Sequence, residues 1–188
     1  MSDSAVEAAD ISSGNKRVAL LIAALALALA LTQVVGDDAK TEAQMKNVES
    51  ANLWAFFQAR TIRQTILGVE ADRATFDATQ IADPAAREAL EQQVKRWRAT
   101  ITRWESEPET REGRRELMQR ARDAEAARER AIQDDGRYGT ASALLQIGIV
   151  LASAAIISGM MALAWAAGVL GVAGSALAAL TYLGIALL

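Results

Sequence analysis

The feature that most constrains this chain is the absence of charge from its C-terminal part. Residues 138–188, the last 51 of 188, contain no Asp, Glu, Lys or Arg. A helix that crosses a bilayer needs about 20 apolar residues, so this segment is long enough for two membrane spans, which we predict at 140–166 and 169–188. Gly168 and Gly171 predict a tight turn between the spans. Such a turn makes a hairpin whose outer ends lie on one face of the membrane.

A third apolar run lies near the N-terminus, where residues 18–35 contain no charged side chain. We predict a membrane helix at 18–36, preceded by a polar tail at 1–17. A positively charged start followed by an apolar core is also the pattern of a cleaved signal peptide. The run is longer than a usual signal core, which favours the membrane span. The predicted fold class is therefore all-α, an integral membrane protein with three transmembrane helices.

The region between the first and second spans, 37–137, has a helical pattern. Its two prolines lie in sequences typical of helix starts: Asp83 precedes Pro84, and Pro108 lies in an S-x-x-E capping box that begins at Ser106. We therefore predict soluble helices at 37–81, 84–105 and 108–134.

The lengths of these helices restrict their arrangement. At 1.5 Å per residue, the first helix is about as long as the other two together, and the chain must return to the membrane face that it left. This predicts a long antiparallel, coiled-coil-like helical hairpin with its turn at Asp83 and Pro84. A break at Gly68 would instead give a shorter four-helix bundle.

Apolar residues recur at alternating spacings of three and four along both arms of this hairpin, as they do in helices that pack on one another. We predict that they form the seam between the arms. In the first arm they are Met45, Val48, Asn52, Ala55, Ala59, Ile62, Ile66, Val69 and Phe76, with Arg73 as a misfit; in the second they are Leu90, Val94, Trp97, Ile101 and Trp104.

Three aromatic side chains beside this seam exceed what one hairpin contact needs. Trp54, Phe56 and Phe57 cover more than one face of the helix, which indicates a second contact, within a bundle or between subunits. The polar residues around them can bind acidic groups on the returning helices, such as Glu125 or Glu129. We therefore predict an interaction site at Trp54, Phe56, Phe57, Gln58, Arg60 and Arg63.

The same stretch carries a short motif. Trp54, Phe57, Gln58, Ala59 and Arg60 follow the pattern W-x-x-Y/F-Q-A-K/R. In this motif, and in its layout of one span, a helical region and a hairpin of spans, the chain resembles an uncharacterised bacterial family. That family is known only as a domain of unknown function with three predicted spans. The resemblance supports the architecture and implies no activity.

The composition excludes several kinds of chemistry. Without His or Cys, the chain lacks the commonest general base, thiol nucleophiles and the usual transition-metal ligands. Glutamates within 105–112 offer oxygen ligands for a divalent cation, but the arginines within 111–115 would neutralise them. Residues 37–137 hold 18 Lys and Arg against 20 Asp and Glu, so no broad basic face suits nucleic acid. We predict no enzyme, no metal, no cofactor and no nucleic-acid partner.

The orientation in the membrane follows from the basic residues near the span ends. Lys16 and Arg17 alone favour an inside N-terminus. The wider count favours the helical region instead, which has seven basic residues near its ends: Lys40, Lys46, Arg120, Arg122, Arg128, Arg130 and Arg137. We therefore predict a multi-pass protein of the cell (inner) membrane with 37–137 in the cytoplasm.

The function that fits these features is that of a membrane-anchored interaction protein. Its partners would be the lipid bilayer, further copies of the chain as a homo-oligomer, or an unknown protein. The alternative is a small channel or transport component formed by oligomerised spans, and ion flux in proteoliposomes would favour it.

Overall fold

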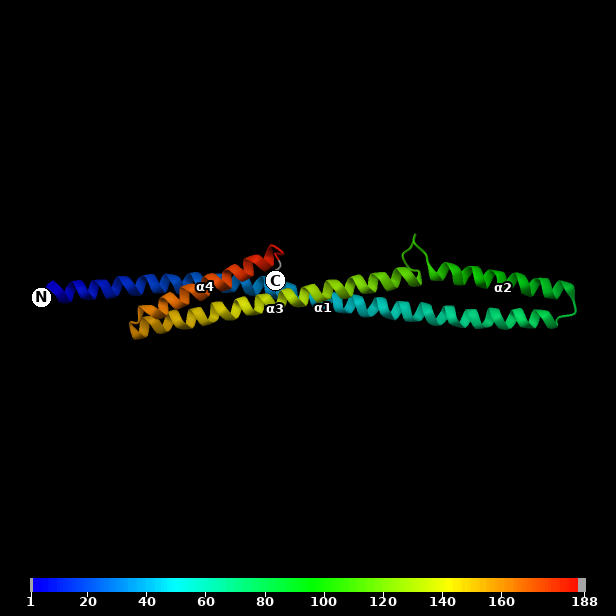
Figure 1. Ribbon diagram of the computed structural model, residues 1–188, viewed down its shortest axis with the longest axis horizontal. Helices are drawn as coiled ribbons and strands as arrows, with labels where there is room; N and C mark the ends of the chain where they lie inside the picture. Colours follow the sequence, from blue (N-terminus) through cyan, green and yellow to red (C-terminus); the bar gives the residue numbers. More distant parts are fainter. Residues whose placement is uncertain (1, 186–188) are drawn as a thin grey trace. The chain divides into compact units, whose positions relative to one another are not determined.

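The structure is a computed structural model that describes the backbone of residues 2–185 and the side chains of residues 16–185. This part of the chain is helical apart from short connections, so the predicted all-α class is confirmed. Figure 1 shows its helices in chain order: α1 (Ser2–Gln80), α2 (Pro84–Glu105), α3 (Arg114–Ser158) and α4 (Met161–Tyr182).

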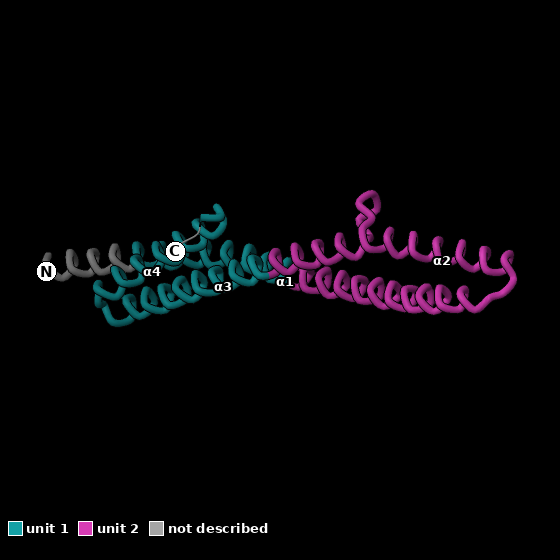
Figure 2. Tube along the Cα trace, turned by 45° about the vertical axis from the view of Figure 1, so that its right-hand side comes forward, with its two compact units in different colours: residues 1–43, 129–188 teal, residues 44–128 magenta. Residues whose placement is uncertain are grey.

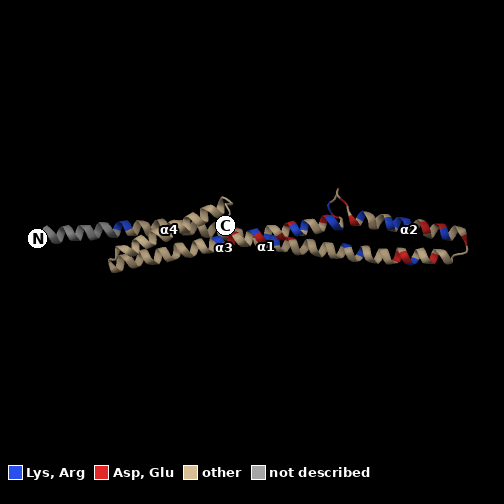
Figure 3. Cartoon of the chain, in the orientation of Figure 1, with Lys and Arg blue, Asp and Glu red and all other residues tan. Residues whose placement is uncertain are grey.

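The chain divides into two compact units, coloured separately in Figure 2. Unit 1 comprises residues 1–43 and 129–188, and unit 2 comprises residues 44–128. Unit 1 contains the apolar segments of three helices that are long and apolar enough to cross a membrane, namely α1, α3 and α4, judged over the described residues. Figure 3 shows α4 without a charged residue, whereas charges of both signs follow one another along α2.

Small side chains form the core of unit 1. Ala152 and Ala155 of α3 are buried against Ala164 and Ala167 of α4, together with Val18 of α1. Helices in lipid pack closely through such residues, because lipid offers no hydrophobic drive between them.

The turn between α3 and α4 lies at Gly159 and Met160, so the predicted turn at Gly168 and Gly171 is wrong. Gly159 has φ +70 and its N–H donates to the Ala155 carbonyl at 3.0 Å, which ends α3 in a left-handed residue. Gly168 and Gly171 are interior residues of α4. A side chain at Gly171 would lie 2.2 Å from Leu25 Cδ2, so this glycine serves close packing and not a turn.

In unit 2, α2 and the beginning of α3 run antiparallel to α1 (Figure 1). Gln64 donates to the Ile101 carbonyl at 3.2 Å, and Trp54 donates to Glu125 at 2.8 Å. Two buried clusters hold the helices together. One contains Leu53, Leu117, Ala121 and Ala124, and the other contains Ala71, Ala74 and Val94.

Helix α2 has the range expected from the sequence. The Asp83 carboxylate accepts the Ala85 N–H at 3.1 Å, and Pro84 occupies the first turn. Arg87 reaches back to the Ile81 carbonyl, which closes the connection from α1.

The predicted helix 108–134 is wrong at both ends. Residues 108–111 form a single turn, which Arg111 ends at φ 58, and α3 begins only at Arg114. Ser106 does not cap a helix at Pro108, because its hydroxyl donates to the Glu116 carboxylate at 2.6 Å. At its other end α3 continues to Ser158.

Helix α1 is also longer than expected, since it passes without a break through Gly36 and Gly68. The structure therefore lacks, over its described residues, the break on which the alternative four-helix bundle depends. One glycine inside a helix costs about 1 kcal/mol, which the packing of a long helix readily offsets.

Candidate interaction surface

Within unit 2, α1 has one face buried against the returning helices. Ser50, Leu53, Ala71, Ala74 and Ala78 are buried along it. Phe57, Gln64 and Leu67 are partly buried on the same face. The alanines near the end of α1 let the backbones of α1 and α2 approach closely.

A second face of α1 is exposed, and it carries the residues that the sequence placed in the seam. We define the stripe as Met45, Val48, Asn52, Ala55, Ala59, Ile62, Ile66, Val69, Arg73 and Phe76. All of these residues are exposed in the structure. Its six large apolar side chains, Met45, Val48, Ile62, Ile66, Val69 and Phe76, are 58–66% exposed. The prediction that this series is the hairpin seam is therefore wrong.

The error has a physical reason. Residues on both faces of α1 recur with a heptad period. Near the C-terminal end of α1, however, the buried face consists largely of alanine, at Ala71, Ala74 and Ala78. Small residues give a weak hydrophobic signal in a sequence, although they permit the closest packing of helices. The larger residues of the stripe gave the stronger pattern, but they lie on the exposed face of α1, away from α2 and α3.

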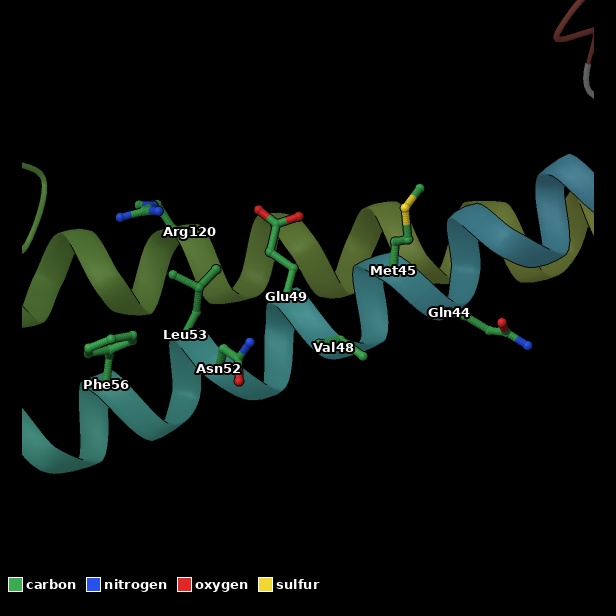
Figure 4. A pocket seen from close by; sticks show the side chains of 8 residues that line it. All are labelled: Gln44, Met45, Val48, Glu49, Asn52, Leu53, Phe56 and Arg120. Atoms are coloured by element: carbon green, nitrogen blue, oxygen red, sulfur yellow. The ribbon is translucent and has the colours of Figure 1, made fainter.

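An open groove adjoins the start of the stripe (Figure 4). Its lining includes Met45, Val48, Asn52 and Phe56 of α1, with Arg120 of α3 at its edge. Phe56 is 66% exposed. Apolar side chains of α1 make up much of the groove, and its lining also includes the polar Gln44 and Asn52 and the charged Glu49. This mixture suits an amphipathic helix.

Two of the predicted interaction residues belong to the core of the hairpin. Trp54 and Phe57 pack on the cluster around Leu53 and Leu117. Their rings lie edge to face, with centroids 5.4 Å apart and an interplanar angle of 89°. The indole N–H of Trp54 also donates to Glu125, which the sequence had suggested as a partner of the polar residues beside Trp54 and not of Trp54 itself.

Of the other four predicted interaction residues, three are exposed and one binds another part of the hairpin. Phe56, Gln58 and Arg63 are exposed. Arg60 instead binds the connection between α2 and α3, where its guanidinium donates to the Glu112 carbonyl at 2.8 and 3.1 Å. The guanidinium also lies 5.7 Å from the centroid of the Trp104 ring.

An ion-pair cluster at the same connection agrees with the prediction that arginines within 111–115 neutralise the acidic run, although the sequence did not give the individual partners. Arg114 donates to both oxygens of Glu105, at 2.7 and 2.9 Å, and Arg115 donates to it at 3.0 Å. The hydrogen bonds from Arg114 lower the pKa of Glu105 to about 2, and those from Gln64 and Arg115 add to the effect. The only sequence signal was the density of Glu and Arg between 105 and 115.

The same cluster includes glutamates that the sequence offered as oxygen ligands for a cation. Glu105 faces Arg114 and Arg115, and the Glu107 carboxylate lies 3.8 Å from both Arg60 and Arg103. The carboxylates are thus used as partners of arginine, which links α2 to α1 and α3.

Comparison with known families finds one match that covers most of the chain. A family described as "Domain of unknown function (DUF4337)" matches residues 14–184. The chain belongs to this family. The DUF4337 match covers both units, so the membrane-type helices and the helical hairpin are parts of one domain. No curated protein and no solved structure matches the chain.

Membership in DUF4337 confirms the predicted relation to a family of unknown function. The bacterial origin and the motif at Trp54 to Arg60 stay predictions.

Proposed function

We propose that this DUF4337 protein is a non-enzymatic integral membrane protein whose helical hairpin binds another helix through the stripe. Three apolar helices are available to anchor it in a bilayer. The hairpin of unit 2 would then carry the stripe on a face that its own helices leave uncovered.

The observation that carries this proposal is the exposure of the stripe. Its six large apolar residues recur at helical spacing on one face, and each is more than half exposed. Covering such a side chain stabilises by about 1–2 kcal/mol. Contiguous apolar surface of this extent on a soluble segment is typical of a binding face.

The proposal is tested by the accessibility of the stripe in native membranes. The chain has no native Cys, so Ile66→Cys introduces a single thiol on the stripe and Asn47→Cys introduces one on an exposed position outside it. We expect a water-soluble maleimide to label Cys at 66 much more slowly than Cys at 47. Denaturation in SDS should make the two rates equal. Equal rates in intact membranes as well would show that nothing covers the stripe.

We also propose that residues 37–137 face the cytoplasm, from the number of basic residues near the span ends. Ala82 lies exposed in the connection between α1 and α2. In intact cells, with any outer membrane permeabilised, a membrane-impermeant maleimide should label Ala82→Cys only after lysis. Labelling before lysis would place the hairpin outside the cytoplasm.

A further inference from the structure

We infer that the partner of the stripe is the stripe of a second copy of this chain, in a parallel, in-register coiled coil. The inference rests on the proposed function, because it requires membrane insertion and a covered stripe. It adds the identity and orientation of the partner.

The register of the two faces supports a coiled coil. Stripe residues occupy the first and fourth positions of successive heptads, called a and d. Positions b and f hold the residues that pack inside the hairpin, including Leu53, Phe57, Ala71, Ala74 and Ala78. The two sets lie on nearly opposite sides of α1, so a second helix can cover the stripe without displacing α2 or α3.

The membrane fixes the direction of such a pair. Copies inserted in one bilayer with the same topology are related by a rotation about the membrane normal. Their α1 helices then leave the bilayer in the same direction, and equivalent residues meet at equal heights. An antiparallel or shifted pairing of α1 would require one copy to insert upside down or at a different depth.

Asn52 is the residue that favours an identical partner. It lies at position a among apolar neighbours and is exposed in the single chain. In a parallel pair in register, the two Asn52 amides meet and bond to each other, which specifies register in parallel coiled coils. A partner with an apolar residue at this height would leave the amide without a hydrogen bond.

The residues that flank the stripe are compatible with the same register. In a parallel pair, position g of one helix faces the next position e of the other. Gln58 would then face Arg63 of the second copy, where its amide oxygen can accept from the guanidinium, and Thr65 would face Glu70. Asp72 would face Asp77, but Arg73 lies between them on each helix and already approaches Asp77 at 3.9 Å.

The length of the stripe is sufficient for a coiled coil. Residues 45–76 cover more than four heptads, above the three or four that a coiled coil needs. Two copies would bury on the order of 1,000 Å² of apolar surface, which is the lower limit for a specific interface. The β-branched residues at position d also permit more than two strands, and equivalent residues meet in a parallel, in-register assembly of either size.

A disulfide at a seam position tests the inference in the full chain. Ala59 is a small stripe residue at position a, and Ala59→Cys places two thiols within bonding distance only if equivalent residues meet. Asn47→Cys, at position c, faces away from the seam and is the matched control. Native membranes containing either variant are oxidised and run on a non-reducing gel, after equal helix content has been verified by circular dichroism.

We expect a disulfide-linked dimer from Ala59→Cys and none from Asn47→Cys. Equal dimer yields from both variants would indicate random collision and would overturn the inference. Absence of a dimer at 59, while Cys at 66 stays protected from maleimide, would show that a different protein covers the stripe; the proposed function would then stand and this inference would fall. Absence of a dimer together with rapid labelling at 66 would overturn both.

Discussion

Gly113 lies directly before α3 and packs against the first residues of the connection from α2. A Cβ at this position would lie 2.4 Å from the Glu107 backbone nitrogen and 2.8 Å from Ser106 Cα. Backbone atoms cannot yield as a flexible side chain does, so Gly113→Ala should shift α3 away from Ser106 and weaken its hydrogen bond to Glu116.

We expect Gly113→Ala to lower the free energy of unfolding by about 2 kcal/mol. Gly68→Ala is the matched control, because nothing lies within 4 Å of a Cβ there; it should raise helix stability by up to about 1 kcal/mol. Urea titration of the full chain in detergent, followed by circular dichroism, measures both. A destabilisation of equal size at the two sites would contradict the described connection.

Glu105 makes the stability of the hairpin depend on pH. Hydrogen bonds from Arg114 lower its pKa from 4.5 to about 2. The folded state therefore favours the carboxylate, and the resulting stabilisation is complete above pH 4.5 and is lost as the pH falls from 4.5 towards 2. Because the side chain is 22% exposed, we discount the effect for solvent and expect about 2 kcal/mol.

Glu105→Gln isolates this contribution, since Gln cannot ionise. At pH 7 the wild-type chain should be more stable than the variant by that amount, and the difference should shrink to near zero as the pH approaches 2. Glu116, whose pKa is also lowered, by its hydrogen bond from Ser106, is present in both chains and cancels in the comparison. A difference that does not change between pH 7 and pH 2 would exclude this role for the carboxylate.

At the scale of elements, α1 has two faces that each form or offer a helix contact. Phe57 belongs to the buried face, where it contacts Trp54 and the core around Leu117, and its ring centroid lies 5.9 Å from the Arg114 guanidinium carbon. Phe56, the next residue, points away from that core and is 66% exposed. Adjacent phenylalanines thus lie on different faces of α1, Phe57 against the core of the hairpin and Phe56 exposed.

Phe57→Ala should lower the free energy of unfolding of the hairpin by about 2 kcal/mol, because a half-buried ring is removed from the core. Phe56→Ala should change it by less than about 0.5 kcal/mol. Trp54 lies in the affected core, so urea titration followed by tryptophan fluorescence reports the change. If Phe56→Ala proved the more destabilising variant, the assignment of the two faces would be reversed.

The sequence predicted the elements better than their ends and faces. Proline and Asp83 defined the start of α2, because a fixed φ and a side-chain cap act locally. The end of α3 depended on which of several glycines turns the chain. Gly159 adopts a positive φ and ends α3, whereas Gly171 lies inside α4 against Leu25. Arg60 contacts Glu112 from a distant part of the sequence, and Glu105 contacts Arg114 across an irregular connection, so helical spacing alone could not reveal either pairing.

At the scale of the whole molecule, the chain contains three membrane-type helices and a hairpin that leaves one apolar face open. If the chain is inserted as proposed, the bilayer confines the copies to one plane and one direction. This lowers the entropic cost of bringing two stripes together. A modest stripe that would pair weakly in solution can therefore pair well in a membrane.

The most direct test of this account is the mass of the protein in a mild detergent, measured by light scattering during size-exclusion chromatography. The wild-type chain should elute as two or more copies of its 20.0 kDa mass. Ile66→Glu places a charge on the stripe, and it should elute as a single copy with unchanged helix content. Asn47→Glu, outside the stripe, should keep the wild-type mass. A single copy for the wild-type chain, or an unchanged assembly for Ile66→Glu, would contradict association through the stripe.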